Sequence, residues 1–337
     1  MSRDREQLIT LGHGGGGRLM HELITGELLA ASDVMTEADM EDAALIAGGA
    51  LAMSTDSFTV QPLFFPGGDI GTLTVNGTVN DVAMRGARAR WLSIGMIIEE
   101  GLPLADLRRI VRSIHDSCAV DGVHIITGDT KVVERGAADG IFINSTGVGE
   151  VFADPAPGAT LARPGDVALV SVTLGDHGVA ILAAREELGL TGELESDCVS
   201  LLSLVEGVWQ AIGDGLHCLR DATRGGLAAA LNEIAMASKV SIEIQERALP
   251  IRSEVRGACE LLGLAPLEIA NEGKLLAIVS AESADAALAA MRALPTGADA
   301  AIIGTVGAGP AGRVSARTLL GTSRIVDLPA GELLPRI

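Results

Sequence analysis

Apolar residues recur along the first half of the chain with two periods, one typical of strands and the other typical of helices. Residues 104–120 are predicted to form a helix, because their apolar side chains fall on one helical face: Leu107, Ile110, Val111, Ile114 and Cys118. Shorter apolar runs predict strands at 50–58, 90–98, 123–133 and 140–151, and a helix is predicted at 69–85. Strands and helices therefore alternate in this half.

The second half alternates again after a Pro- and Gly-rich stretch, "FADPAPGATLARPGD", at Phe152–Asp166. Strands are predicted at 167–175, 240–246, 273–280 and 300–307, and helices at 176–189, 201–212, 253–263 and 284–295. Residues 220–237 are predicted to form a turn that leads into a helix, with Asp221 or Thr223 as its N-cap.

The alternation predicts an α/β protein of the α+β type, with two domains that are each a sheet covered by helices. A chain of 337 residues is long enough for two domains. The Pro- and Gly-rich stretch separates an N-terminal domain at 1–151 from a C-terminal domain at 152–310. A C-terminal strand region and tail are predicted at 311–337.

Composition limits where the protein works. Hydrophobic residues make up 48% of the chain, yet no apolar run reaches the ~20 residues of a membrane helix. The N-terminus has no apolar core of a signal peptide, so a cytoplasmic location without a membrane partner is expected. The four cysteines form no C-x-x-C pair and are predicted to be small buried side chains: Cys118, Cys198, Cys218 and Cys259.

The formal net charge of −19 disfavours nucleic acid as a partner, because phosphate backbones need a basic surface. Tyrosine is absent and aromatic residues are few, so a platform for base stacking is not expected. An acidic protein can still bind a nucleoside triphosphate when Mg²⁺ lies between its carboxylates and the phosphates.

Three aspartates in the first half are candidates for such a magnesium site: Asp56, Asp81 and Asp129. Each has a hydroxyl or amide neighbour, which is Thr55, Asn80 or Thr130 respectively. Oxygen ligands on separate segments are what Mg²⁺ and a polyphosphate require. Any one of these aspartates alone would be read as a cap or turn residue. Three of them in one domain favour a shared site.

Other segments carry weaker phosphate-binding signals. Lys131 shares a strand face with Asp129, so it could hold a phosphate or transfer a proton, although a plain surface lysine is a fair alternative. The loop "GHGGGGR" at Gly12–Arg18 could bring backbone N–H groups close to phosphates, but it matches no phosphate-binding signature. "RDATRGG" at Arg220–Gly226 is typical of an anion site at a helix start, and "ANEGK" places Glu272 in a turn before a strand.

Taken together, several motifs resemble one family: "STDSFTVQPLFFPGGDIG", "GTVNDVAMRGA", "TGDTKVVERGAADGIFINSTGVG", "LGDHG", "RDATRGGL" and "ANEGK". They are similar to the HypE family of hydrogenase-maturation proteins. That family belongs to a superfamily with aminoimidazole-ribotide synthetase, selenophosphate synthetase and thiamine-monophosphate kinase. The resemblance covers essentially the whole chain. The three aspartates are shared by the superfamily, whereas "PLFFPGGDIG" and the final "LPRI" are specific to HypE.

The resemblance implies an architecture like that of aminoimidazole-ribotide synthetase, with a mixed sheet in each domain and an N-terminal domain that forms a homodimer. It implies ATP in a cleft between the domains and Mg²⁺ on Asp56, Asp81 and Asp129. The residues predicted to bind ATP are His13, Gly14, Gly15, Asn80, Thr130, Asp221, Arg224 and Asn271. The implied partners are the carbamoyltransferase HypF and the HypC–HypD iron-scaffold complex.

The resemblance also implies a reaction. A transferase loads a carbamoyl group onto a C-terminal cysteine, and the protein uses ATP to dehydrate this thiocarboxamide to a thiocyanate. The cyano group then passes to the iron of a [NiFe] hydrogenase. Lys131 and Glu272 match positions implied in proton handling. Carboxylates near Lys131 would keep it protonated, so Glu272 is the preferred base.

The family's tail reads "PRIC", whereas this sequence ends at Ile337, so the acceptor cysteine is absent from it. Pro329 and Pro335 are expected to stiffen the tail, which lowers the entropy lost when its tip docks. Two other functions are compatible with the residues. One is a selenophosphate-synthetase-like enzyme, although no cysteine lies near the Gly-rich loop. The other is a non-catalytic ATP-binding scaffold for hydrogenase maturation.

Overall fold

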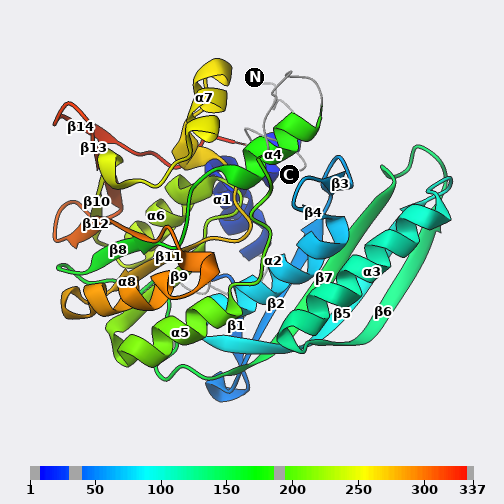
Figure 1. Cartoon of the computed structure of the whole chain (residues 1–337), viewed down its shortest axis with the longest axis horizontal. Helices are drawn as coiled ribbons and strands as arrows, with labels where there is room; N and C mark the ends of the chain where they lie inside the picture. The colour runs from blue at the N-terminus through cyan, green and yellow to red at the C-terminus, as the bar shows by residue number, and fades with distance from the viewer. Residues whose placement is uncertain (1–7, 30–39, 186–193, 332–337) are drawn as a thin grey trace, which may run out of the picture.

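Two sheets lie side by side, one built by each half of the chain (Figure 1). The computed structural model describes residues 8–29, 40–185 and 194–331. The first sheet has five strands in the order β1-β2-β7-β5-β6, and the second has seven in the order β14-β13-β10-β12-β8-β11-β9. The predicted fold class, two mixed sheets covered by helices, is confirmed.

The first sheet is antiparallel except at one pair of strands. Its strands are β1 (Ala44–Ile46), β2 (Leu51–Phe58), β5 (Ala87–Glu99), β6 (His124–Val133) and β7 (Ile141–Val151). Strands β5 and β6 run parallel, because helix α3 (Leu104–Asp121) forms the crossover between them. A short hairpin of β3 (Phe64–Phe65) and β4 (Gly68–Asp69) precedes helix α2.

Helix α2 (Ile70–Met84) is the central element of the molecule (Figure 1). The Asp69 side chain caps its start by accepting hydrogen bonds from the N–H groups of Gly71 and Thr72, at 2.8 and 3.1 Å. The helix contacts β2, β5 and β7 of the first sheet on one side, and β9 and α5 of the second half on the other. It is buried almost all round, which explains why its sequence has no continuous polar face.

The second sheet is packed on both faces. Its strands are β8 (Val167–Val170), β9 (Leu216–Asp221), β10 (Ser241–Gln245), β11 (Leu275–Val279), β12 (Ala301–Gly307), β13 (Arg313–Arg317) and β14 (Ser323–Ile325). Its helices are α4 (Asp176–Ala184), α5 (Leu202–Ile212), α6 (Gly226–Ala237), α7 (Ser253–Leu262) and α8 (Ala284–Arg292). Alternate residues of β11 pack toward α5 and α8 or toward α6, so its whole run "LLAIV" is apolar.

The two described ends of the chain meet beside the second sheet. Residues near the N-terminus form a 3₁₀ turn (Leu11–Gly14), helix α1 (Arg18–Leu23) and a π-helical turn (Ile24–Leu28). The N–H of Arg18 donates to the carbonyl of Pro329 at 2.7 Å. Gly17 lies so close to this carbonyl that a Cβ on it would be 2.1 Å from the oxygen. Residues 332–337, which hold the predicted tail and Ile337, lie outside the described residues.

Two local predictions were wrong. Arg220 and Asp221 belong to strand β9, which was not predicted, rather than to a turn. The N-cap of α6 is Gly225, not Asp221 or Thr223, because the chain turns there through a left-handed conformation, with a φ of 77° at Gly225. The predicted helix at 176–189 is described only to Arg185, and α4 ends at Ala184.

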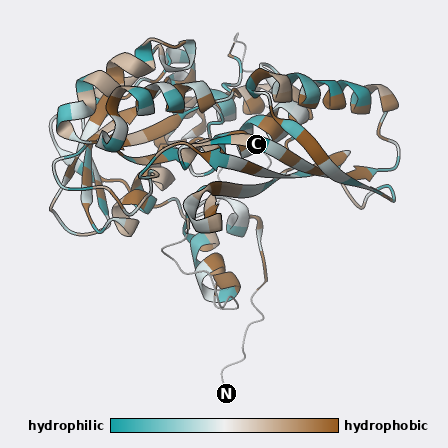
Figure 2. Cartoon of the chain, turned by 90° about the horizontal axis from the view of Figure 1, so that it is seen from below, coloured by the Kyte–Doolittle hydropathy of each residue, from teal (hydrophilic) through white to brown (hydrophobic). Residues whose placement is uncertain are grey.

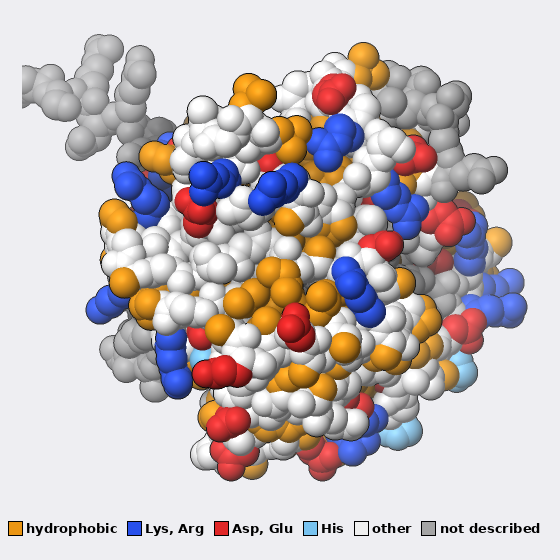
Figure 3. All heavy atoms as spheres, turned by 60° about the vertical axis from the view of Figure 1, so that its left-hand side comes forward, with side chains coloured by type: hydrophobic (Ala, Val, Ile, Leu, Met, Phe, Trp, Pro, Cys, Tyr) orange, Lys and Arg blue, Asp and Glu red, His pale blue; other side chains and the backbone are white. Residues whose placement is uncertain are grey.

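The cysteines and the surface agree with the sequence. All four cysteines are buried and unpaired, as predicted. None of the helices in the described part of the chain has the length and apolar character needed to span a bilayer. On the face shown in Figure 3, Lys and Arg side chains are scattered among acidic and apolar ones and form no continuous basic stripe.

Candidate active site

A cavity of about 1420 Å³ is lined by the N-terminal segment, β2, α2, the start of α6 and the turn that precedes β11. Seven of the sequence-predicted site residues line it: His13, Gly14, Asp56, Asp81, Asp221, Arg224 and Glu272. They come from both halves of the chain. The cavity is large enough for a nucleotide, since ligand pockets commonly measure about 300–1,000 Å³.

Carboxylates from four separate segments face this cavity. Asp81 projects from α2, and its Oδ2 accepts a hydrogen bond from the Ser54 hydroxyl at 2.6 Å. Asp56 projects from β2, and its Oδ1 lies 3.6 Å from Nη2 of Arg224. Asp221 ends β9 and is buried, and one of its oxygens, Oδ2, has no hydrogen-bond partner. Glu272 adds a carboxylate from the turn before β11.

These carboxylates resist ionising together. Burial raises the pKa of Asp81 well above its usual range, and the charges of Asp221 and Asp56 add to the effect. Burial likewise raises the pKa of Asp221 to about 8. Burial also raises the pKa of Asp56, and the nearby Arg224 only partly offsets it. A bound cation would relieve this repulsion.

The donor set fits Mg²⁺ rather than a softer metal. In the described part of the chain, no group of three or more His, Cys, Asp or Glu side chains could hold a metal ion as it stands. The acids at the cavity nevertheless offer hard oxygen donors, excess negative charge and an unpartnered oxygen on Asp221. Oxygen ligands are those that Mg²⁺ prefers. Asp56, Asp81 and Asp221 are the residues of this cavity that would hold it.

Glu272 lies on the turn "ANEGK", where the backbone is fixed from two sides. Its N–H donates to Asp197 Oδ1 at 3.3 Å, and its carbonyl accepts from Asn80 Nδ2 at 3.0 Å. Burial raises the pKa of Glu272 well above its ordinary value, and the negative charges of Asp221 and Asp197 add to the effect. A carboxylate with a raised pKa is a stronger base, which suits proton abstraction.

Asn80 was predicted to bind ATP, but in the structure its side-chain amide forms hydrogen bonds with the backbone of other segments. Besides the carbonyl of Glu272, Nδ2 donates to the carbonyl of Val199 at 3.0 Å, and Oδ1 accepts from the N–H of Leu201 at 2.7 Å. Asn80 is fully buried and is not among the residues that line the cavity. The side chain therefore braces the site in this structure.

Asn271 was also predicted to bind ATP, and its amide is likewise engaged. Oδ1 accepts from the N–H of Gly175 at 2.7 Å, and Nδ2 donates to the carbonyls of Ala222 and Ile269 at 2.7 and 3.0 Å. Asn271 is buried and does not line the cavity. It ties the turn that carries Glu272 to the end of β9.

In the Gly-rich loop, His13 and Gly14 line the cavity, whereas Gly15 is buried and does not. The His13 ring is turned toward its own turn, with Nδ1 accepting a hydrogen bond from the N–H of Thr10 at 3.0 Å. Gly16 packs on Arg224: a Cβ on it would be 2.5 Å from the Arg224 carbonyl. The loop therefore lines the cavity next to the start of α6.

Asp129, Thr130 and Lys131 do not reach the cavity of their own chain. All three are exposed on β6, the edge strand of the first sheet, where Asp129 pairs with Gly95 of β5. A single chain therefore brings Asp56 and Asp81 together with Glu272, but leaves Asp129 and Lys131 outside.

Some site residues escaped the sequence reasoning. Asp42 and Arg220 line the cavity and form an ion pair with each other. Burial raises the pKa of Asp42 to about 6, although Arg220 opposes the rise. Lys274 is buried behind the site. Arg220 begins the motif "RDATRGG", which the sequence analysis singled out without giving Arg220 a role. Lys274 also had a signal, because it directly precedes the apolar run "LLAIV", where a charge must be paired.

The fold and the acidic cavity define a two-domain protein of the AIR synthase related class. Family models for the N-terminal and C-terminal domains of AIR synthase related proteins match residues 40–151 and 163–317. The chain is 50% identical to "Carbamoyl dehydratase HypE" of Rhodobacter capsulatus over 337 residues, which is 99% of each chain. The chain therefore belongs to the HypE family of carbamoyl dehydratases, whose members act in hydrogenase maturation.

Solved structures of the same family are closely similar. A HypE–HypF complex matches with a TM-score of 0.87 and 46% identity, covering 91% of this chain and 99% of that one. HypE in complex with ATP matches with a TM-score of 0.82 and 50% identity, covering 97% of this chain and 99% of that one.

Proposed function

We propose that this chain binds ATP and Mg²⁺ in the acidic cavity and dehydrates a carbamoyl group carried on a C-terminal cysteine. The product is a thiocyanate that supplies cyanide ligands for the iron of a [NiFe] hydrogenase. The observation that carries the proposal is the convergence of Asp56, Asp81, Asp221 and Glu272 on one cavity. The similarity to HypE in complex with ATP supports the nucleotide.

The acids divide into a cation-holding group and a base. Asp56, Asp81 and Asp221 would hold Mg²⁺, which neutralises negative charge on the phosphates when it is bound. Arg224, which is partly exposed beside Asp56, is placed to contact a phosphate oxygen. No side chain of this cavity needs to act as a nucleophile, because the carbamoyl oxygen itself attacks the terminal phosphate.

Glu272 would handle the protons. Phosphorylation of the carbamoyl oxygen turns it into a leaving group, and the amide nitrogen must lose its two protons as phosphate departs and the C≡N bond forms. Glu272 is a carboxylate with a raised pKa in the same cavity, so it can accept a proton there. Lys131 is the second candidate for this role. It ranks below Glu272 because it does not line the cavity of its own chain.

A homodimer would account for the exposed position of Asp129 and Lys131. Large apolar side chains are exposed on β5 and on the edge strand β6: Trp91, Ile97, Ile125, Ile126 and Val132. The long strands on the right of Figure 2 carry brown, hydrophobic stretches. An apolar sheet surface of this kind is typical of an interface. We propose that it pairs two chains, and that β6 of the partner subunit brings Asp129, Thr130 and Lys131 to the cavity.

This dimer makes a direct prediction. Changing Ile126, whose side chain is 65% exposed, to Asp would place a charge in the interface. We expect the dimer dissociation constant to rise by at least about tenfold, as measured by analytical ultracentrifugation. Val120→Asp is the control, because Val120 is also exposed but lies on α3. A wild-type chain that is monomeric at micromolar concentration would contradict the prediction.

The segment just before the tail, at Leu328 and Pro329, is held by the Gly-rich loop beside the cavity. Leu328 lines the cavity, and Pro329 accepts the hydrogen bond from Arg18. The φ of Gly17 is −111°, so alanine fits its backbone, but the new Cβ would collide with the Pro329 carbonyl. Gly17→Ala should therefore break the hydrogen bond between Arg18 and Pro329 without straining the backbone of residue 17.

We expect hydrogen exchange at the Arg18 amide to speed up by about five- to tenfold in Gly17→Ala, the amount that one lost hydrogen bond permits. Exchange is measured by mass spectrometry on peptides that span the loop. Gly26→Ala is the matched control, because no atom lies within 4 Å of a Cβ at Gly26. Equal protection of the amides from exchange in Gly17→Ala and in the control would mean that the hydrogen bond between Arg18 and Pro329 does not order the loop.

The partners follow from the same reaction. The similarity to a HypE–HypF complex supports a HypF-type carbamoyltransferase as the donor of the carbamoyl group. We further propose a HypC–HypD-type complex as the acceptor of cyanide, and the cytoplasm as the place of the reaction. The acidic surface is compatible with such protein contacts.

The decisive experiment uses a chain that carries the acceptor cysteine. A cysteine is added after Ile337, and the chain is incubated with the transferase, carbamoyl phosphate and Mg²⁺–ATP while its intact mass is followed. A carbamoyl adduct that then loses one water is expected. An adduct that forms but persists would favour an ATP-binding scaffold. Turnover of selenide instead would favour a selenophosphate synthetase.

A further inference from the structure

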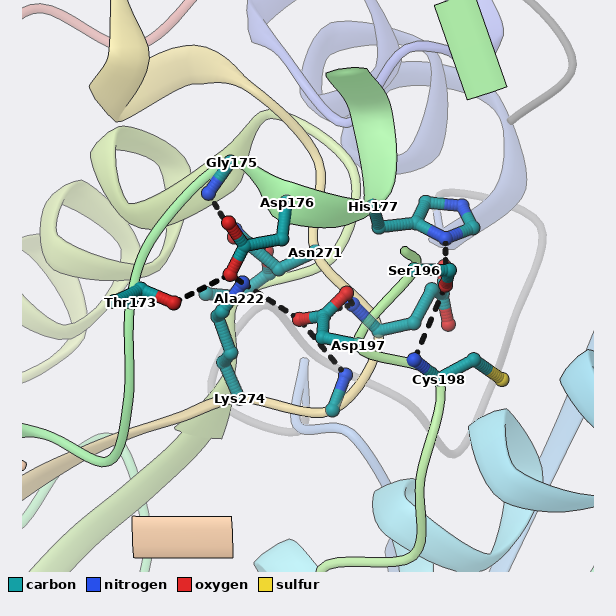
Figure 4. A network of polar contacts seen from close by, with 12 residues as sticks. Thr173, Gly175, Asp176, His177, Ser196, Asp197, Cys198, Ala222, Asn271 and Lys274 are labelled. Atoms are coloured by element: carbon teal, nitrogen blue, oxygen red, sulfur yellow. Dashed lines mark hydrogen bonds and ion pairs between the residues drawn. The ribbon is translucent and has the colours of Figure 1, made fainter. Parts of the chain in front are cut away.

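A lysine is buried directly behind the candidate base, two residues along the chain from it. The Lys274 side chain is 1% exposed, and its Nζ lies 3.0 Å from Asp176 Oδ2 and 2.8 Å from Asp197 Oδ2 (Figure 4). Asp176 begins helix α4, whereas Asp197 belongs to a loop that precedes α5. A buried charge is costly unless it is paired, and these two carboxylates pair that of Lys274.

The charges around Lys274 balance without a ligand. Arg252 contributes a second cation, with Nε 3.6 Å from Asp176 Oδ1, so two cations face two carboxylates. Burial lowers the pKa of the neighbouring His177 to about 4, which leaves it neutral. Burial opposes ionisation of Asp197, but Lys274, His177 and the N–H of Gly273 together outweigh it, so the pKa of Asp197 is lowered. The cluster is therefore a buried ionic network in which each cation faces a carboxylate.

One side of this network supports the turn that carries Glu272. The N–H groups of Glu272 and Gly273 both donate to the Asp197 carboxylate, at 3.3 Å each. The backbones of the loop and the turn are in close contact here. A Cβ on Gly273 would be only 1.8 Å from the Asp197 carbonyl oxygen. Asp197 can accept these two bonds only as long as its carboxylate stays in place.

The other side of the same loop rests on the N-terminal domain. The N–H of Ser196 donates to the carbonyl of Pro66 at 2.8 Å. Asn80 of α2 donates from its Nδ2 to the carbonyls of Val199 and Glu272, at 3.0 Å each. The loop therefore packs between α2, which carries Asp81, and the turn that carries Glu272.

We propose that Lys274 and Asp197 are positioning residues for the reaction: their buried ion pair holds the loop against the turn, and so fixes the Glu272 carboxyl relative to α2. This inference rests on the proposed role of Glu272 as the base. Without Lys274, the Asp197 carboxylate would be left near Asp176 with no cation between them. It would then protonate or turn away, and the turn would lose both of its acceptors.

The first test is Lys274→Met in the chain with the added cysteine. We expect the single-turnover rate of dehydration to fall about 10- to 100-fold, because displacement of a catalytic group by about 1 Å has this effect. The dissociation constant for Mg²⁺–ATP should stay within about twofold, as measured by calorimetry. An equal loss in ATP affinity would mean general disruption and would overturn the proposal.

A second variant tests the geometry without changing any charge. Gly273→Ala pushes the Asp197 loop off the turn, and we expect the same pattern of slow dehydration and normal ATP affinity. Gly257→Ala on α7 of the same domain is the matched control, because no atom lies within 4 Å of its Cβ. If Lys274→Met fails to fold, Gly273→Ala carries the test alone, and wild-type rates in it would overturn the proposal.

The third test asks whether the pair acts through Glu272. In a Glu272→Gln background, Lys274→Met should slow the residual reaction no further, because the group being positioned is already lost. Rate losses that multiply would show an independent, merely structural effect and would overturn the inference. Wild-type turnover in Glu272→Gln alone would instead remove the proposed base, and the positioning role would fall with it. The two failures are therefore distinguishable.

Discussion

Replacing Glu272 by Gln is expected to lower the rate of dehydration by about 10²- to 10⁴-fold, the usual contribution of a general base. Glutamine has nearly the same shape, and the contacts of Asn80 and Asp197 reach only the backbone of residue 272. Mg²⁺–ATP should therefore bind with nearly unchanged affinity. The carbamoyl adduct on the added cysteine should form and then accumulate, which intact-mass measurement over time would show.

Glu260→Gln is the control for this prediction, since Glu260 is exposed on α7 in the same domain. It makes the same chemical change far from any packed contact, and it should behave as the wild type. If Glu272→Gln dehydrates its adduct at the wild-type rate, another group must take the amide proton. Lys131 of the partner subunit would then be the next residue to change.

The parts of the fold that depend on local pattern could be predicted from the sequence. Helix α3 was predicted at 104–120 and runs from Leu104 to Asp121, because its apolar stripe and polar face are complete. Helix α2 was also placed correctly, at 69–85 against Ile70–Met84. Strand β9 was missed, because its buried run "LHCLRD" contains His217 and Arg220, whose polar side chains find partners only in the folded protein.

The candidate site was predictable as a set of residue types but not as an arrangement. Asp56, Asp81 and Glu272 meet in one cavity as expected, whereas the motif that carries Asp129 lies on an exposed edge strand. The spacing of residues along one chain cannot show which residues of a second chain would complete the site. The support of Glu272 by Asp197 was equally hidden, because the two residues are brought together only by the packing of the loop on the turn.

Replacing Asp81 by Asn is expected to abolish the stabilisation that Mg²⁺ adds to ATP binding, while leaving the ligand-free protein at least as stable as the wild type. Burial and the charges of Asp221 and Asp56 already disfavour the ionised form of Asp81, so removing its charge relieves repulsion. Asparagine can still accept the hydrogen bond from Ser54. The cost should appear only when a cation must be held.

Thermal unfolding with ATP, with and without Mg²⁺, measures this directly. Saturation at 100 times the dissociation constant stabilises a protein by about 2.7 kcal/mol, so the wild type should show a clear rise in Tm with both ligands. In Asp81→Asn the part of the rise that depends on Mg²⁺ should disappear. Asp116→Asn on the exposed face of α3 should keep it. A full Mg²⁺-dependent rise in Asp81→Asn would show that Asp81 does not hold the cation, and the repulsion at the cavity would then need a different explanation.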